Sequence, residues 1–377
     1  MEKQNNVPKL RFPEFSDAWE MKKLGEICES ISSGKSKLND VSFKFPFYGS
    51  TGIIGYSENF DYSGKNILIA RVGANAGSLY KVNGNYSVSD NTLILNLFKN
   101  IEPDFIYYFL KYSNLNKLVF GSGQPLITGG QLKGLKLNIP TLQEQQKIAT
   151  FLSTVDEKLQ ALKKKKSLLE TYKKGVMQKL FSQKIRFKDD EGNDFEDWKM
   201  LNGNLIFESI SDRNHNSDLP ILAITQEFGA IPRNLIDYQV SVTDKSVETY
   251  KVVDIGDFII SLRSFQGGIE YSNYRGICSP AYIILRPHRE VNRNFYKSYL
   301  KTEEYIKQLN KNLEGIRDGK MISYKYFSEI ELPFPSLPEQ TKIANFLTAI
   351  DEKLNKVDAQ IKQTELWKRG LLQQMFV

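Results

Sequence analysis

Apolar residues recur at alternating spacings of four and three along two stretches of the chain, residues 140–183 and 335–377. Such a heptad pattern is typical of a helix that packs along another helix. Pro140 and Pro335 stand just before the two patterns, where a helix is expected to begin. The pattern therefore predicts two helices, each about 60 Å long, that pair as a coiled coil. The apolar positions are Ile148, Leu152, Val155, Leu159, Leu162, Leu169, Val176 and Leu180 in the first stretch and Ile343, Leu347, Ile350, Leu354, Val357, Ile361, Leu371 and Met375 in the second.

Polar residues interrupt both apolar seams. Lys166 and Lys173 do so in the first stretch, and Thr364 and Lys368 in the second. A lysine at a seam can lay its stem against apolar neighbours and keep its amine in water. A polar residue there can instead fix the register of the two helices or mark the place where a partner helix docks. The sequence leaves these interpretations open.

The chain contains an internal repeat. Residues 140–159 (PTLQEQQKIATFLSTVDEKL) recur as residues 335–354 (PSLPEQTKIANFLTAIDEKL), with 13 of 20 positions identical at a constant offset of 195. A second repeat stands before each intervening segment. Because the whole chain is thus a duplication, we expect a pseudo-two-fold axis, and neighbouring termini if the helices run antiparallel. The second repeat matches Leu10, Arg11, Phe12, Phe15 and Trp19 with Ile185, Arg186, Phe187, Phe195 and Trp198.

The two segments between the helices mix strand-like and helix-like runs, and the order of the runs is the same in both. Glycine-rich turns close the strand-like runs, and Arg71 aligns with Arg263 in the first of them. The side chains of the polar glycine loops differ, which suits one scaffold used twice to recognise two different things. The matching runs are residues 65–81 and 257–273, strands 92–97 and 282–287, aromatic helices 105–112 and 295–302, and glycine loops 121–130 and 314–323.

These patterns predict a duplicated fold of the α/β (α+β) class, with two globular domains and two long helices. We place the first domain with its N-terminal segment in residues 1–139 and the central helix in residues 140–183. A linker and the second domain follow in residues 184–334, and the C-terminal helix occupies residues 335–377. A chain of 377 residues exceeds the usual size of a single hydrophobic core, which agrees with two domains.

Composition and charge narrow the class of protein. Hydrophobic residues make up 41% and charged residues 25%, as in ordinary folded proteins. The net charge of +7 is compatible with a polyanionic partner, and the central helix is the most basic part, with +5 over residues 141–183. Cys28 and Cys278 lie too far apart in sequence to indicate a disulfide framework or a metal cluster. Without a signal-like N-terminus or a long apolar stretch, we expect a cytoplasmic protein.

Motifs for common catalytic sites are missing. An adenine methyltransferase needs an Asn/Asp-Pro-Pro-aromatic motif, and only residues 138–141 (NIPT) come near it. Gly34, Lys35 and Ser36 resemble the end of a phosphate-binding loop, but Glu29 occupies its first glycine position. His215 and His288 are distant from each other and from any cysteine. We therefore predict no catalytic residue, no metal ligand and no cofactor bound by this chain.

The duplicated motif P-x-L-x-E-Q-x-K-I-A-x-F-L-x-x-x-D-E-K-L, alternating with two divergent domains over nearly the whole chain, resembles the specificity (S) subunits of type I restriction–modification systems. This resemblance implies two target-recognition domains, each reading one half of a split, asymmetric site in double-stranded DNA. It implies antiparallel helices that set the spacing and dock two methyltransferase subunits, through which restriction subunits join. S-adenosylmethionine, ATP and Mg would belong to those partners.

Candidate contact residues follow from chemistry, because Arg, Lys, Asn and Gln near glycine turns can pair with guanine or adenine edges. Lys163 and Lys164 of the central helix can lie over DNA phosphates or simply face solvent. The resemblance points to the repeated helix starts as partner-binding. The candidates for DNA in the domains are Arg71, Asn75, Asn91, Gln124, Arg263, Gln266, Arg275, Arg317 and Lys320; those for the partner subunits are Glu144, Gln145, Ile148, Phe151, Glu339, Gln340, Ile343 and Phe346.

Two other classes of protein compete with this interpretation. A coiled-coil scaffold whose domains bind proteins would explain the helices, but not matched domains with divergent polar loops. An enzyme with an unrecognised site would need residues that fit no common motif.

Overall fold

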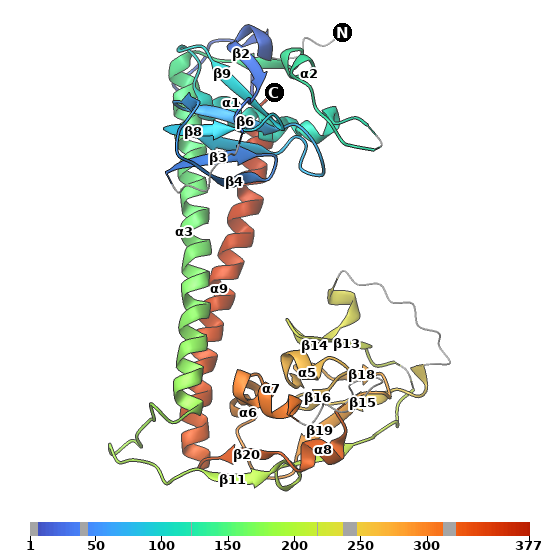
Figure 1. The fold of residues 1–377 in the computed structure, drawn as a ribbon. Helices are drawn as coiled ribbons and strands as arrows, with labels where there is room; N and C mark the ends of the chain where they lie inside the picture. The colour runs from blue at the N-terminus through green and yellow to red at the C-terminus, as the bar shows by residue number, and fades with distance from the viewer. Residues whose placement is uncertain (1–6, 38–43, 122, 217, 237–246, 312–321) are drawn as a thin grey trace. The chain divides into compact units, whose positions relative to one another are not determined.

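The computed structural model describes residues 7–37, 44–121, 123–216, 218–236, 247–311 and 322–377 (Figure 1). The chain divides into two compact units. The first unit joins residues 1–165 to residues 358–377, and the second comprises residues 166–357. Both boundaries fall within the long helices, so each unit contains the start of one helix and the end of the other.

The first unit contains two four-stranded sheets. One has the order β2-β9-β6-β7 with antiparallel pairs, and the other has the order β4-β3-β8-β5 with a single parallel pair between β3 and β8. Its elements are β1 (Glu20–Lys23), β2 (Cys28–Ser33), β3 (Phe45–Gly49), β4 (Gly52–Ser57), β5 (Tyr62–Ser63), β6 (Asn66–Ala70), β7 (Leu79–Val82), β8 (Asn85–Val88), β9 (Thr92–Leu97), α1 (Pro103–Ser113), α2 (Gly129–Lys133), β10 (Lys136–Ile139) and the first part of α3 (Leu142–Phe181), with short 3-10 turns at Leu24–Glu26 and Leu115–Leu118.

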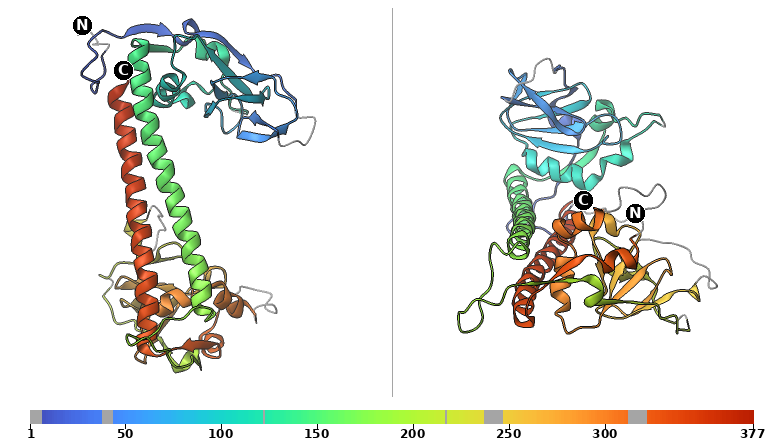
Figure 2. Two further views of the ribbon diagram at one scale, coloured as in Figure 1. Left: turned by 90° about the vertical axis from the view of Figure 1, so that its left-hand side faces the viewer. Right: turned by 60° about the horizontal axis from the view of Figure 1, so that its bottom comes forward.

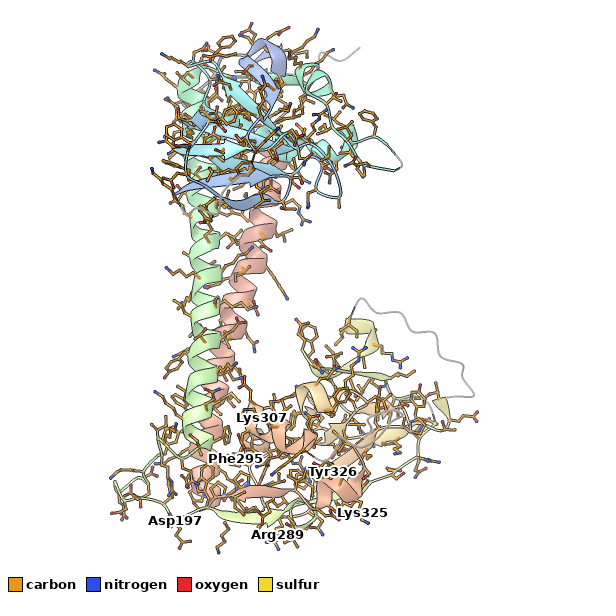
Figure 3. The ribbon with its side chains drawn as sticks, viewed as in Figure 1. Asp197, Arg289, Phe295, Lys307, Lys325 and Tyr326 are labelled. Atoms are coloured by element: carbon orange, nitrogen blue, oxygen red, sulfur yellow. The ribbon has the colours of Figure 1, made fainter. Side chains whose placement is uncertain are left out.

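The second unit repeats the main sheet with the order β12-β19-β16-β17. Its aromatic core includes Phe295 of α6, which Figure 3 labels. Its elements are β11 (Lys199–Asn202), β12 (Phe207–Ile210), β13 (Leu222–Thr225), β14 (Gly229–Pro232), β15 (Lys251–Val253), β16 (Phe258–Ile260), α5 (Ser264–Gly267), β17 (Glu270–Tyr271), β18 (Gly276–Cys278), β19 (Ile283–Pro287), α6 (Arg293–Tyr299), α7 (Glu303–Asn310), α8 (Tyr324–Ser328), β20 (Glu331–Phe334) and the first part of α9 (Leu337–Met375), with 3-10 turns at Gly203–Leu205 and Arg233–Leu235.

The equal strand order confirms the duplicated fold predicted from the sequence. Each main sheet packs against an aromatic helix, α1 or α6, and each domain closes with an antiparallel strand pair, β1 with β10 or β11 with β20. Because most strand pairs are antiparallel, the class is α+β. One expected boundary was wrong: the helix predicted to run to residue 302 ends at Tyr299. The Thr302 hydroxyl accepts a hydrogen bond from the Tyr305 amide and starts α7 there.

A buried carboxylate fastens each domain to the start of the helix that follows it. The side chain of Glu144 accepts hydrogen bonds from Arg11 Nε and Nη2, at 2.7 and 2.8 Å, and from Trp19 Nε1 at 3.2 Å. In the second unit, Glu339 accepts bonds of 3.0 and 2.9 Å from Arg186 and one of 2.9 Å from Trp198. Glu144 and Glu339 are buried, so the two repeats seen in sequence form one network in each unit.

The neighbouring glutamines join the same helix starts to α1 and α6. Gln145 Nε2 donates to the Pro140 carbonyl, and its Oε1 accepts from the Glu102 amide. Gln340 makes the equivalent bonds with Pro335 and the Asn292 amide. Both amide side chains are buried with their polar atoms satisfied, as a closely packed interior requires.

Ion pairs between α3 and α9 occupy the polar gaps at Lys173 and Lys368 in the helical seams. In the first unit Lys368 contacts Asp156, which also accepts a 2.8 Å hydrogen bond from the Tyr108 hydroxyl. In the second unit Lys173 contacts Asp351 at 2.5 Å. The two pairs are equivalent under the offset of 195. They support the interpretation in which polar residues fix the register of α3 and α9.

The helix ends in the first unit run in opposite directions. Asp156 contacts Lys368, whereas Lys163, further along α3, contacts Glu365, which lies earlier in α9. The Leu10 amide donates to the Gln374 carbonyl at 2.9 Å, so the first described residues lie beside the end of α9 (Figure 2). For the described residues, this agrees with the expectation that the two ends of the chain lie close together.

Most of the predicted seam residues are buried. Leu159, Leu162, Leu169, Val176 and Leu354 are only half-buried, so the seam is less enclosed along the middle of α3. Cys28 and Cys278 are free and buried, and burial raises the pKa of each thiol to about 12. Over the described parts of the chain, neither long helix nor any shorter one combines the length and hydropathy needed to cross a membrane.

The substitution Glu339→Gln is expected to destabilise the second unit by about 3 kcal/mol, because it leaves a guanidinium without its buried counter-charge. Glu352→Gln is the matched control, since Glu352 lies exposed on the same helix and should change stability by less than about 0.5 kcal/mol. Chemical denaturation of the two variants measures the difference. Equal losses would show that the carboxylate network does not hold the unit together.

Candidate nucleic-acid interface

The four candidates of the first domain lie on three segments near the end of β6. Arg71 directly follows β6, its amide donates to the Asn91 carbonyl at 2.9 Å, and its carbonyl accepts from the Ile127 amide at 2.9 Å. Asn75 is exposed in the turn after Arg71, and Gln124 is exposed in the loop before α2. The Gly73 amide donates to the Pro125 carbonyl, next to Gln124. The structure therefore brings the backbones of these segments together; Asn75, Asn91 and Gln124 are exposed, whereas Arg71 is half-buried.

The second domain places Arg263 and Gln266 on one short helical turn. Arg263 precedes α5 at the end of β16, and both side chains are exposed. Arg275 lies on a different turn, between β17 and β18, and contacts Asp254 at 3.3 Å. The candidates Arg317 and Lys320 lie outside the described residues.

Two acidic residues reduce the positive charge of the second domain near Arg275. Asp254 and Asp257 both contact Arg286 at 2.7 Å, and hydrogen bonding to Asp257, with the charges of both carboxylates, raises the pKa of Arg286. Arg286 is thus held by the protein, whereas the Arg275 side chain is 65% exposed. Of these two arginines, Arg275 is the one accessible to a ligand.

Each domain has a hairpin with exposed apolar residues that the sequence did not reveal, and in the second domain this hairpin lies beside the candidates. In the second domain Gln226, in the turn between β13 and β14, donates to the Arg263 carbonyl at 3.3 Å. Phe228 of the same turn is exposed, and Figure 1 shows this hairpin next to α5. In the first domain Ile53 and Ile54 are exposed on β4.

Lys163 and Lys164 occupy exposed positions on α3. Lys163 contacts Glu365 at 2.7 Å, and both side chains are about half exposed. An exposed pair of this kind is weak and can open when a phosphate approaches. Lys164 has the more direct access to an anionic ligand, since no ion pair that the structure describes involves it.

The candidates for partner binding are largely occupied within the chain itself. Six of them, Glu144, Gln145, Ile148, Glu339, Gln340 and Ile343, are buried inside their own unit. They hold domain and helix together and present no side-chain surface to another subunit in this structure. Phe151 and Phe346 are only half-buried, and each packs edge-on against a residue of the leading segment, Phe12 or Phe187.

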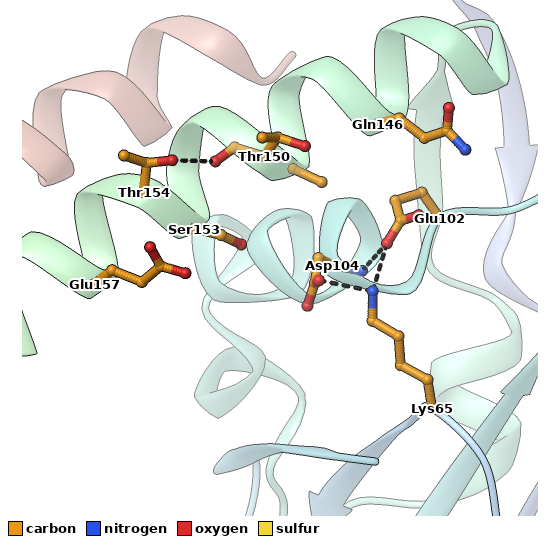
Figure 4. Close-up of a pocket in the computed structure, with 9 residues that line it drawn as sticks. Lys65, Glu102, Asp104, Gln146, Thr150, Ser153, Thr154 and Glu157 are labelled. Atoms are coloured by element: carbon orange, nitrogen blue, oxygen red, sulfur yellow. Dashed lines mark hydrogen bonds and ion pairs between the residues drawn. The ribbon is translucent and has the colours of Figure 1, made fainter. Parts of the chain in front are cut away.

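A polar pocket of about 490 Å³ lies between the start of α1 and the first half of α3 (Figure 4). Lys65 contacts Glu102 and Asp104 at 2.8 Å in its wall. Although burial favours the neutral acid, hydrogen bonding from Lys65 and the charge of Lys81 hold the pKa of Asp104 below its ordinary value. With Glu157 also in the lining, the pocket is acidic and does not suit a phosphate backbone.

The two histidines have structural partners. His215 Nε2 lies 3.0 Å from the Tyr250 carbonyl, and His288 Nε2 lies 2.9 Å from the Asn204 carbonyl. Over the residues that the structure describes, His, Cys, Asp and Glu nowhere form a group of three able to hold a metal ion.

Comparison with known proteins gives one consistent family. The family model described as "Type I restriction modification DNA specificity domain" matches residues 16–171 and 198–364, one match for each copy of the duplication. The putative type I restriction enzyme MjaX specificity subunit of Methanocaldococcus jannaschii is 28% identical, over 98% of this chain and 95% of the relative. The MjaVIII specificity subunit of the same organism is 24% identical, over 98% and 95%.

Solved structures share the fold. The crystal structure of the type I restriction–modification system S subunit from M. genitalium matches with a TM-score of 0.66 and 18% identity, covering 98% of this chain and 99% of that one. A chain from a study of complex assembly and conformational transition of a type I restriction–modification system matches with a TM-score of 0.54 and 16% identity, covering 94% and 96%.

The turn that carries Arg263 and Gln266 depends on a glycine. Gly268 has φ +79°, and a Cβ there would lie 2.1 Å from the Leu300 carbonyl oxygen. Gly192 in the same unit has φ +90°, but a Cβ there would meet nothing within 4 Å. We expect Gly192→Ala to destabilise by about 1 kcal/mol through backbone strain, and Gly268→Ala by at least about 3 kcal/mol because a backbone clash is added. Thermal unfolding of both variants tests this; equal shifts in Tm would contradict the close packing of the turn.

Proposed function

From the premise that the chain belongs to the DNA-specificity family of type I restriction–modification systems, we propose that it is the subunit that reads a bipartite, asymmetric site in double-stranded DNA. Each domain would read one half-site. The observation that carries the proposal is the equal strand order of the two main sheets combined with different side chains on the loops at their ends. A scaffold kept twice with divergent polar loops fits recognition of two different sequences.

The polar side chains on these loops, of which Arg71 is half-buried and the others are exposed, have the chemistry for base recognition. Arg71 and Arg263 can donate two parallel hydrogen bonds to a guanine, and Asn75, Asn91, Gln124 and Gln266 can pair with an adenine. Loops mounted on the end of a sheet hold such groups more accurately than free segments do. Lys164 on α3 suits a sequence-independent phosphate contact.

Docking of two methyltransferase subunits, and of restriction subunits through them, is the second part of the proposal. The long helices leave Leu168, Tyr172, Leu366 and Trp367 exposed, between 47% and 67%. Apolar side chains of this size on a helix surface mark a place where another protein packs. Under the repeat offset Tyr172 corresponds to Trp367, which suits one such surface for each of two partner subunits. The buried helix-start residues would support these surfaces from within.

Chemistry would then be delegated to the partners. S-adenosylmethionine, ATP and Mg would bind those subunits, and this chain would supply specificity without a catalytic residue of its own. The buried cysteine thiols, whose pKa values lie far above neutrality, agree with this division because such thiols are poor nucleophiles.

The first test concerns the two half-sites. With the chain bound to its methyltransferase partner, Arg71→Ala should reduce base discrimination in the first half-site by roughly tenfold to a hundredfold, because a bidentate contact is lost. Arg263→Ala should act in the same way on the second half-site alone. Selection from a randomised DNA library reports both half-sites at once, so each variant carries its own internal control. A wild-type complex that selects no DNA sequence would refute this function. That outcome would favour the alternative, a scaffold whose domains bind proteins.

The second test concerns the spacing between half-sites. Deleting residues 160–166 together with residues 359–365 removes one heptad from each helix and keeps the ion pairs of Lys173 and Lys368. Seven residues of helix rise about 10 Å, so the preferred spacer should shorten by about three base pairs at 3.4 Å per pair. Mapping the methylated adenines measures the spacer and both half-sites together. An unchanged spacer with intact half-sites would show that the helices do not set the spacing.

A further inference from the structure

The α5 turn of the second domain is held by side chains from three separate elements. Gln226 of the β13–β14 turn donates to the Arg263 carbonyl at 3.3 Å. Asn310 at the end of α7 donates to the Phe265 carbonyl at 2.6 Å, and Lys301 after α6 donates to the Gly267 carbonyl at 3.0 Å. Alternate carbonyls of the turn are thus each fixed by a different element. We refer to Gln226, Lys301 and Asn310 as the clamp.

Lys301 is itself fixed by a buried acid. Its amine contacts Glu270 at 2.5 Å, and the Glu270 side chain is only 3% exposed. Burial raises the pKa of Glu270 and lowers the pKa of Lys301, so each group needs the other to remain charged inside the domain. Because Glu270 balances its charge, the Lys301 amine is poorly suited to contact phosphate. Its remaining hydrogen bond is directed at the backbone of the turn.

A four-residue helical turn has little stability of its own, because the entropy of ordering its backbone exceeds what its few internal bonds return. Yet this turn stands at the surface with Arg263 and Gln266 exposed on it, and with Leu262 beside them at 50% exposure. Base recognition requires such groups to be held within a fraction of an ångström. The clamp supplies that rigidity, with Lys301 and Asn310 half-buried and Gln226 in the adjoining exposed hairpin turn.

The corresponding segment of the first domain is held differently. There the Gly73 amide donates to the Pro125 carbonyl and the Gly77 amide to the Ala70 carbonyl, so main-chain bonds fix the turn after β6. Substitution of side chains can therefore loosen the reading turn of the second domain without an equivalent effect on the first. Comparing the two half-sites can therefore distinguish an effect of the clamp on the second reading turn from a general effect on folding.

We propose that Gln226, Lys301 and Asn310 are positioning residues that determine the specificity of the second half-site by holding the α5 turn rigid. This inference rests on the proposed function. It assigns specificity to the hydrogen bonds that these three side chains make to the backbone of the turn, and it places the reading surface of this domain on α5 and the adjoining hairpin tip.

The test uses the full chain bound to its methyltransferase partner and the variants Lys301→Met, Asn310→Leu and Gln226→Met. Each removes a donor while keeping much of the side-chain volume. We expect discrimination among bases in the second half-site to fall by roughly threefold to tenfold for each, the worth of one hydrogen bond, with the first half-site unchanged. Lys307→Met is the matched control, because Lys307 lies exposed on α7, the same helix as Asn310 (Figure 3). Lys301→Arg should restore most of the discrimination.

Hydrogen exchange of the free chain gives a readout that does not depend on DNA. The Gln266 and Gly268 amides donate to Arg263 and Ser264 carbonyls within the turn, and their exchange should accelerate in the clamp variants but not in Lys307→Met. Gln226 lies in an exposed turn, so Gln226→Met keeps the test available if a buried variant fails to fold. Unchanged second-half-site selection in folded variants would overturn the clamp. Loss of selection by the wild-type complex would instead overturn the proposed function.

Discussion

The buried carboxylate at the start of each long helix is the interaction on which the rest of the structure depends. Glu144 and Glu339 tie the segment that enters a domain to the helix that leaves it, through an arginine and a tryptophan in each unit. Strand pairs β1–β10 and β11–β20 close the domain at the same place. Because entry and exit are fixed together, everything between them can change without moving the helices.

Because the ends of each domain are fixed in this way, two domains with the same strand order can carry different turns at the position proposed to read DNA. The turn after β6 is held by main-chain bonds, and the turn after β16 is held by Gln226, Lys301 and Asn310. Main-chain bonds tolerate many side chains, whereas the clamp requires specific donors at three distant positions. The same architectural position can therefore be made rigid by different means, and the polar groups displayed there can differ accordingly.

Features with a local periodicity could be predicted from the sequence, and those that depend on distant contacts could not. The heptad pattern predicted both ends of α3 and α9 to within two residues, and the strand-like runs predicted β9 and β19. Glu144 was predicted to bind a partner subunit, yet it is buried against Arg11, which lies 133 residues away in the sequence. The repeat contained the missing signal: Arg11, Trp19 and Glu144 all recur as Arg186, Trp198 and Glu339, which indicates that they act together.

The ion pairs in the helical seam show why both copies of the repeat are needed in each unit. Lys173 belongs to the first copy but pairs with Asp351 of the second, and Lys368 of the second pairs with Asp156 of the first. Lys173 and Lys368 therefore each pair with an acid of the other copy and not with one of their own. When two equal helices run antiparallel, the Lys173–Asp351 and Lys368–Asp156 pairs form at the same time. The duplication and the antiparallel direction of the helices are therefore both needed for these two ion pairs.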